Sequence, residues 1–149
     1  MDAVTYPEIK VIEFVNQHLI PLRVPADSKL ADEFIVRWTP TIIILDADGK
    51  THHRTLGFLS VDEFIPSMYL GIAKTCFDAA QFEKALVYID NLLTEYPKSS
   101  FGPEGVYLQG VCRYKTTHNA KQLREAFETL KAKYPASEWV KRASPYSLL

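Results

Sequence analysis

The sequence is poor in cysteine and has no long apolar run, and both absences limit what this protein can be. Its 149 residues contain two cysteines, Cys76 and Cys112. Two cysteines so far apart form no disulfide framework, no Cys-x-x-Cys pair and no cysteine-based metal site. No apolar stretch approaches the ~20 residues that cross a bilayer, and the N-terminus lacks the basic stretch and apolar core of a signal peptide. We therefore expect a cytoplasmic chain with no membrane partner.

The sequence also has no large excess of positive or negative charge, since 17 basic side chains balance 18 acidic ones. Nucleic-acid-binding proteins usually present a concentrated basic face, so none is expected as a partner. The sequence has no phosphate loop, Ser-His-Asp arrangement or pair of catalytic carboxylates. His52 and His53 point to opposite faces of a strand, and His18 and His118 lie near helix ends, so surface or capping roles are expected. We predict no catalytic residue, no metal site and no cofactor.

The first part of the chain alternates between helical and strand patterns. A capping-box signal at Thr5 and Glu8 precedes apolar residues at helical spacing, which predicts a helix ending near Leu19. The apolar run Leu19–Val24 is interrupted by Pro21 and stopped by Pro25, and it predicts an outer strand. A second helix is predicted from Asp27 or Ser28 to Trp38.

The segment Trp38–Lys50 is the most informative stretch of the sequence. Thr39-Pro40 forms an elbow, where an X-Pro bond makes a cis peptide affordable at roughly 0.5–1 kcal/mol. The β-branched run Thr41–Leu45 predicts a buried strand, and the Asp48-Gly49 turn leads to an antiparallel partner at His52–Phe58. A capping-box signal at Ser60 and Glu63 then opens a helix over residues 60–77.

These motifs resemble a thioredoxin-like protein. The segments that carry the resemblance are Met1–Tyr6, Val11–Asn16, Trp38–Thr41, Asp46–Lys50 and Gly57–Phe58. The resemblance implies an α/β thioredoxin-like fold over residues 1–66 whose first strand and Cys-x-x-Cys segment are absent from this chain. It also implies that Trp38, Thr39 and Pro40 bind an extended substrate peptide. Pro25 departs from the pattern, because an acidic residue commonly ends that strand.

Without a first strand, the strands at 19–24 and 41–45 would face each other across a gap. Each unpaired buried backbone group would cost on the order of 1–3 kcal/mol. We therefore expect the two strands to close together, a partner to donate a strand, or two copies to form a homodimer through exposed strand edges. We also expect Met1 to be an internal methionine of a longer protein, which could then be periplasmic.

The second part of the chain, residues 67–149, carries an internal repeat. Glu95–Ser99 recurs as Lys133–Ser137, a period of 38 residues, and each copy ends an amphipathic helix. Helix-turn-helix units followed by proline resemble tetratricopeptide repeats, whose usual period is about 34. The pattern predicts an all-α region of two degenerate helical hairpins, closed by a capping helix at residues 137–143. The first helices carry Lys74 and Lys115, which could line a groove for acidic groups of a partner.

The leading interpretation is a non-catalytic thioredoxin-like and tetratricopeptide-type module that binds a protein or peptide. An alternative is a fragment of a longer thiol-disulfide oxidoreductase whose Cys-x-x-Cys lies upstream of Met1. Under either hypothesis Cys76 and Cys112 serve packing, because buried free cysteine behaves as a small hydrophobe.

Overall fold

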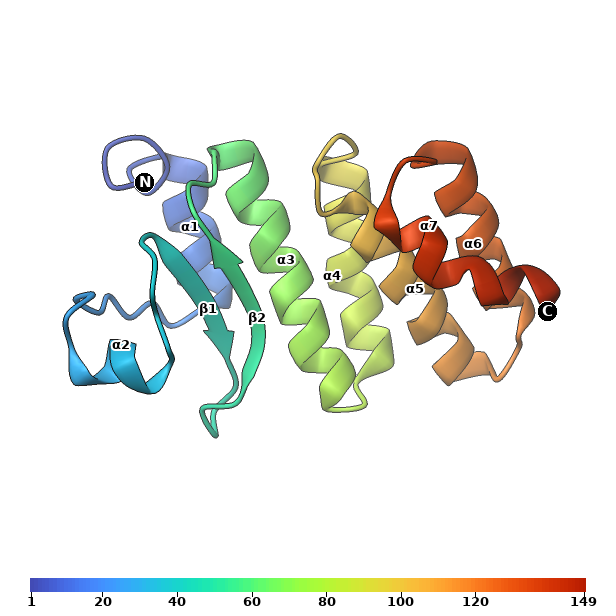
Figure 1. Ribbon diagram of the computed structural model, residues 1–149, viewed down its shortest axis with the longest axis horizontal. Helices are drawn as coiled ribbons and strands as arrows, with labels where there is room; N and C mark the ends of the chain where they lie inside the picture. Colours follow the sequence, from blue (N-terminus) through green and yellow to red (C-terminus); the bar gives the residue numbers. More distant parts are fainter.

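A computed structural model describes residues 1–149 and shows a small sheet joined to a row of helices (Figure 1). The elements in chain order are α1 (Ile9–His18), α2 (Lys29–Glu33), β1 (Thr41–Leu45), β2 (Thr51–Leu56), α3 (Val61–Asp78), α4 (Phe82–Glu95), α5 (Gly102–Thr117), α6 (Lys121–Lys133), α7 (Glu138–Ala143) and a 3-10 turn at Ser144–Leu148.

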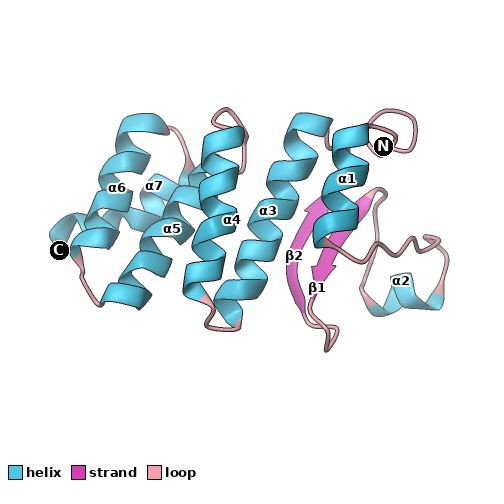
Figure 2. Cartoon of the chain, turned by 180° about the vertical axis from the view of Figure 1, so that it is seen from behind, coloured by secondary structure: helices cyan, strands magenta, loops and turns pink.

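Helices α3, α4, α5 and α6 lie side by side along the long axis of the molecule, with the two termini at opposite ends (Figures 1 and 2). Helix α3 is the element that joins the two parts of the chain. It contacts α1, β1 and β2 on one side and α4 and α5 on the other. Pro66 lies inside α3 without ending it, so one continuous helix spans the predicted boundary between residues 66 and 67.

The sheet has two antiparallel strands, β1 and β2. Strand β1 occupies Thr41–Leu45, which confirms the predicted strand, and β2 ends two residues before the predicted Phe58. Ile44 and His53 face α3 at Gly71, where a Cβ atom would lie 2.2 Å from Ile44 Cδ1 and 3.0 Å from His53 Cβ. The absence of a side chain at Gly71 therefore lets the sheet approach the helix closely.

The outer strand predicted at Leu19–Val24 is wrong. Residues 19–25 form no strand, and the backbone amides of Ile20, Leu22, Arg23 and Val24 donate no hydrogen bond. A strand is defined by its neighbour, and no neighbouring strand lies beside this segment. The element order therefore contains one strand fewer than predicted.

The second helix is shorter than predicted, because α2 ends at Glu33 and not at Trp38. Ser28 caps its start, with the Oγ atom accepting from the Ala31 amide at 3.2 Å. Its end is a Schellman motif: the Val36 amide donates to the Ala31 carbonyl, and Ile35 takes the left-handed conformation with φ of +53°. Arg54 on β2 donates to the carbonyls of Phe34 and Ile35 and so holds this end against the sheet.

Neither predicted capping box forms. Thr5 is fully buried and its hydroxyl donates to the Leu59 carbonyl at 2.7 Å, while α1 begins at Ile9 without a side-chain cap. Helix α3 begins directly after Ser60 as predicted, but the Glu63 carboxylate accepts hydrogen bonds from Ser99 and Ser100 instead of the helix N-terminus. Both side chains thus join distant segments.

The helical part follows its sequence pattern closely. Most apolar residues at helical spacing in α4 and α6 are buried, namely Ala85, Ile89, Leu92, Leu123, Phe127 and Leu130, whereas Phe82 is half-buried. The C-terminal helix is present as α7, where the Ser137 hydroxyl accepts from the Trp139 amide and Trp139 packs beside Tyr107. Local helical periodicity is therefore sufficient to place this core.

Candidate functional site

The elbow Trp38-Thr39-Pro40 lies between α2 and β1, at the end of the sheet. The Thr39-Pro40 peptide bond is cis. The Pro40 carbonyl accepts from the Gly57 amide at 2.8 Å, and the Trp38 carbonyl accepts from the Thr41 hydroxyl at 2.5 Å. These two bonds fix the residues on either side of Thr39.

Thr39 itself is exposed, and its backbone N–H and C=O make no hydrogen bond within the protein. Beside it, the indole of Trp38 is 69% exposed. An unpaired amide and carbonyl next to a large exposed aromatic ring offer both backbone pairing and apolar contact to a ligand.

A hollow of about 360 Å³ opens at this elbow, lined by Ala26, Val36, Arg37, Trp38 and Thr39. Of the three predicted residues, Trp38 and Thr39 line this hollow and Pro40 does not. The sequence analysis missed the other three lining residues. Val36 and Arg37 could have been found as immediate sequence neighbours of Trp38, whereas Ala26 comes from a separate loop and carries no sequence signal.

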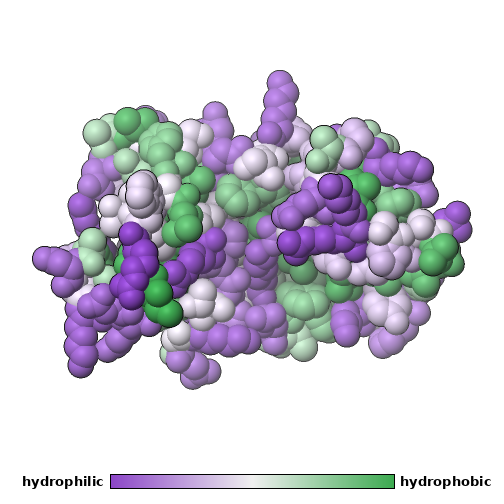
Figure 3. Space-filling model, in the orientation of Figure 1, coloured by the Kyte–Doolittle hydropathy of each residue, from purple (hydrophilic) through white to green (hydrophobic).

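The surface of this part of the molecule mixes hydrophobic and hydrophilic side chains (Figure 3). Several large apolar side chains are exposed around the elbow and the sheet. They include Leu30, Ile35, Leu45, Leu56 and Phe58.

The two cysteines lie far from the elbow, in the helical part of the chain. Cys76 on α3 and Cys112 on α5 are free, buried and members of one apolar cluster with Ala73, Ala85 and Ile89. Burial raises the pKa of the Cys76 thiol and raises that of Cys112 to about 12. Both side chains are thiols at neutral pH, and they lack the lowered pKa of a reactive cysteine.

Lys74 and Lys115 differ in their surroundings. Lys74 is partly buried on α3, forms an ion pair with Glu104 of α5 and lies 3.4 Å from His53 Nδ1. Lys115 is exposed near the end of α5. The charge of Lys74 is already compensated within the protein, so the predicted groove offers one uncompensated cation, Lys115, and stays a prediction.

His53 is a buried histidine, and the expected surface role is wrong for it. Its Nε2 atom lies 3.0 Å from the hydroxyl of the fully buried Ser67, and its ring packs edge-on against Phe101. Burial and the neighbouring Lys74 charge lower its pKa to about 4. His53 is therefore neutral at pH 7 and joins β2 to α3 through a polar contact in the core.

His52 also has a structural role, in a charged cluster at the far end of the hairpin. Its ring nitrogens lie 2.8 Å from the carboxylates of Asp46 and Asp78, and Lys50 pairs with Asp78 at 3.2 Å. The hydrogen bond from His52 lowers the pKa of Asp46. Burial alone would raise the pKa of Asp78, but hydrogen bonds from His52 and Lys50 bring it below its usual value. The cluster ties the β-hairpin to the end of α3.

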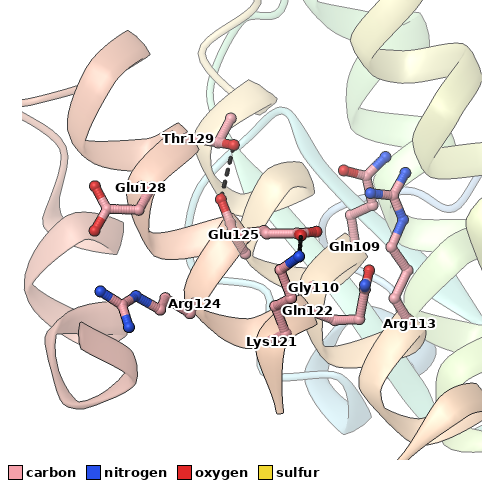
Figure 4. A pocket seen from close by; sticks show the side chains of 10 residues that line it. Gln109, Gly110, Arg113, Lys121, Gln122, Arg124, Glu125, Glu128 and Thr129 are labelled. Atoms are coloured by element: carbon pink, nitrogen blue, oxygen red, sulfur yellow. Dashed lines mark hydrogen bonds and ion pairs between the residues drawn. The ribbon is translucent and has the colours of Figure 1, made fainter. Parts of the chain in front are cut away.

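A larger hollow of about 530 Å³ lies between α5 and α6 (Figure 4). Its lining is almost entirely polar and carries both charges. Lys121 and Glu125 pair with each other across 3.8 Å, and Arg124 donates to the Leu149 carbonyl. These internal partners compensate Lys121, Glu125 and Arg124, whereas Arg113 and Glu128 form no ion pair.

No group of three or more His, Cys, Asp or Glu side chains is placed to hold a metal ion. None of the helices is long and apolar enough to span a membrane. The elbow is the candidate site, because its unpaired backbone and exposed indole could offer backbone pairing and apolar contact.

Comparison with known proteins agrees with this description of the first part of the chain. No curated protein and no solved structure matches the sequence significantly. Residues 4–72 match the family model of the thioredoxin-like domain, a span that includes the elbow, the sheet and most of α3. This part of the chain is a thioredoxin-like domain.

Proposed function

We propose that this protein is a non-catalytic protein-interaction module that holds an extended peptide segment at Trp38, Thr39 and Pro40. The observation that carries the proposal is the unpaired backbone of Thr39 beside the exposed indole of Trp38. A peptide laid along the elbow would pair with Thr39 and rest a side chain in the hollow beside Trp38. Backbone pairing gives affinity largely independent of sequence, and the hollow selects for apolar side chains.

The cysteines support the non-catalytic part of the proposal. Thiol-disulfide exchange needs a thiolate that can reach a disulfide. Cys76 and Cys112 are buried in the helical cluster and their pKa values are raised. Neither sulfur lies at the elbow where a peptide would bind.

We propose a second contact surface on the helical part, which we interpret as two tetratricopeptide-like hairpins, α3/α4 and α5/α6. Small residues let the helices of each pair approach closely, Ala73 and Ala85 in the first and Gly110 and Ala126 in the second. In the second pair the small residue of α6 that faces Gly110 is Ala126. Lys115 is the exposed cation that an acidic partner would meet on this surface.

Tryptophan fluorescence tests peptide binding directly. The protein has two tryptophans, so the variant Trp139→Phe leaves Trp38 as the sole reporter. We use carboxymethylated insulin B chain as the probe, because it is extended and has no free thiol. We expect a saturable blue shift of Trp38 emission, since the probe would remove the indole from water.

A matched pair of variants assigns the binding to the elbow. Trp38→Ala should weaken probe binding at least tenfold, about 1.4 kcal/mol, when binding is followed by calorimetry. Val87→Ala removes an exposed apolar side chain from α4 and should leave the affinity unchanged. Equal affinities for both variants, or no binding to the parent protein, would overturn the proposal.

The thioredoxin-like match favours a second candidate function, thiol-disulfide exchange within a longer protein. That activity requires a cysteine pair beyond the two helical cysteines described above. An insulin-reduction assay with dithiothreitol separates the candidates: we expect this chain to show no rate above background. Clear turnover would favour the oxidoreductase.

A further inference from the structure

One edge of strand β1 has no neighbour. The Pro40 carbonyl accepts from Gly57, and the register pairs Ile42 with Thr55 and Ile44 with His53. In an antiparallel ladder the bonds to one neighbour come from alternate residues. The amides and carbonyls of Thr41, Ile43 and Leu45 therefore point away from β2, to an edge where the two-stranded sheet ends.

The segment Ile20–Val24 is a second unpaired stretch of backbone. It leaves α1 in an extended conformation, with φ of −135° and ψ of 158° at Leu19, and none of its amides donates a hydrogen bond. Its apolar side chains are open to solvent, with Ile20 98% and Leu22 77% exposed. The backbone amides of this segment have no partner within the single chain, and its one polar side-chain contact is the exposed ion pair between Arg23 and Asp2.

The prolines give the segment one usable edge. Successive residues of an extended chain direct their N–H groups to opposite sides. Pro21 and Pro25 remove two donors from one side, whereas Ile20, Leu22 and Val24 keep all three donors on the other. Proline is tolerated in strands where its side of the backbone faces solvent. The segment is thus suited to be the outermost strand of a sheet, pairing through its intact side.

Each chain therefore has two unpaired stretches of backbone, the outer edge of β1 and the segment Ile20–Val24. Each is five residues long. The two do not pair with each other within the chain. Pairing between two copies would satisfy both at once, because a two-fold axis makes every such contact occur twice.

We propose that two copies of this chain form a symmetric dimer in which Ile20–Val24 of each copy pairs with strand β1 of the other. Each sheet then has three strands, with Ile20–Val24 of the opposite copy as its outer strand. The pairing covers the unpaired groups of Thr41, Ile43 and Leu45, and it places Ile20 and Leu22, which share one face of an extended chain, on one face of the sheet. This inference goes beyond peptide binding at the elbow and does not depend on it.

Light scattering coupled to size-exclusion chromatography tests the proposal on the full chain without any peptide. We expect a mass of twice 17.0 kDa at high micromolar concentration. A monomer over the whole accessible concentration range would overturn the dimer. Because no probe is present, the result is independent of the fluorescence experiment at the elbow.

Proline substitutions at two neighbouring positions test which side of the Ile20–Val24 backbone pairs with β1 of the other copy. Leu22→Pro removes a donor from the intact side and should shift the protein to monomer. Arg23→Pro removes a donor from the side that already carries the prolines and should leave the dimer in place. Loss of the dimer in both variants, or in neither, would contradict the proposed pairing.

A second pair of variants tests strand β1, the other partner in the pairing. It keeps the proposal testable if the proline variants fail to fold. Ile43→Lys places a charge at the centre of the β1 edge, where lysine opposes strand pairing, so we expect a monomer. Val87→Lys makes the same change at an exposed position on α4 and should keep the dimer. A dimeric Ile43→Lys protein with an unchanged circular dichroism spectrum would overturn the assignment.

Discussion

The two parts of this molecule satisfy their backbone and apolar groups in different ways. From α3 onward, each helix closes its own hydrogen bonds and packs against the helix next to it in sequence. Before α3, the chain has two short helices that do not contact each other, a two-stranded sheet and long connections. Twelve of the fifteen exposed large hydrophobic residues lie before residue 61. The difference teaches that the helices after α3 satisfy their backbone and apolar groups among neighbours in sequence, whereas the sheet part depends on α3 for its core and keeps an unpaired edge that suits binding.

The largest expected difference between the two parts is in stability, when one apolar side chain in each part is truncated. Ile89 is fully buried on α4, and Ile89→Ala should lower the free energy of unfolding by about 3 kcal/mol through lost burial and a cavity. Ile20 is 98% exposed, and Ile20→Ala should change it by less than about 0.5 kcal/mol. Urea unfolding of the single chain at low concentration measures both. Similar losses for the two variants would mean that the sheet part buries Ile20 after all.

The pH dependence of stability tests the contact that joins the two parts, where His53 of β2 meets Ser67 of α3. His53 is neutral when folded because its pKa is lowered to about 4, against 6.5 in an unfolded chain. As pH falls below 6.5 the unfolded state takes up a proton first, so stability falls until about pH 4. The full loss is of the order of 3 kcal/mol.

Urea unfolding between pH 7 and pH 4 tests this contribution with one variant and one control. His53→Gln should flatten the slope in that window, whereas His118→Gln, an exposed position, should keep it. A slope that His53→Gln leaves unchanged would show that His53 does not carry it. Below about pH 4, protonation of Asp46 and Asp78 removes a further contribution, since their lowered pKa values stabilise the fold only when they are ionised.

Two glycine-to-alanine substitutions show how well the helix–helix contact and the helix–sheet contact tolerate an added methyl group. At Gly110 a Cβ atom would lie 2.4 Å from Ala126 Cβ and 3.2 Å from the Gln122 carbonyl, both on the rigid helix α6. Gly110→Ala should cost about 2 kcal/mol by overpacking. At Gly71 the nearest atom is the end of the Ile44 side chain, which can rotate away, and His53 Cβ at 3.0 Å requires only a small shift of β2, so Gly71→Ala should cost less, about 1 kcal/mol. Thermal unfolding ranks the two, and a larger loss at Gly71 would reverse the comparison.

The smallest expected effect concerns the strained end of α2. Ile35 is exposed and has a positive φ, which is unfavourable for a β-branched residue. Ile35→Gly should raise the free energy of unfolding by about 1 kcal/mol, because glycine takes this conformation without strain. The control Ile12→Gly, at an exposed position inside α1, should lower it by about 1 kcal/mol. A destabilised Ile35→Gly protein would mean that the Ile35 side chain makes contacts worth more than the strain.

The sequence predicted the helical part well because its contacts lie between helices that follow one another in the chain. Ala85, Ile89, Leu92 and Leu130 recur at helical spacing, and their packing partners lie on neighbouring helices. Strand β1 was predicted from its β-branched run. The end of α2 was missed, because Arg54, which holds it, comes from a distant strand.

The site itself was predicted in part. Trp38, Thr39 and Pro40 were found through the resemblance to thioredoxin-like proteins, but Ala26 joins them only through the fold. The predicted strand at Leu19–Val24 is not formed, because strand formation depends on a neighbour that sequence periodicity cannot supply. Thr5 and Glu63 carried capping-box signals, yet their side chains bond to segments more than thirty residues away.

Residue-resolved amide hydrogen exchange tests most directly the claim that the sheet part keeps an unpaired edge. In dilute protein we predict slow exchange at Ile42 and Ile44, which donate to β2, and fast exchange between them at Ile43. Raising the concentration should slow Ile43 as the second copy covers the edge, while amides in the middle of α4 stay protected throughout. Slow exchange at Ile43 in dilute protein would contradict the unpaired edge and with it the difference between the two parts.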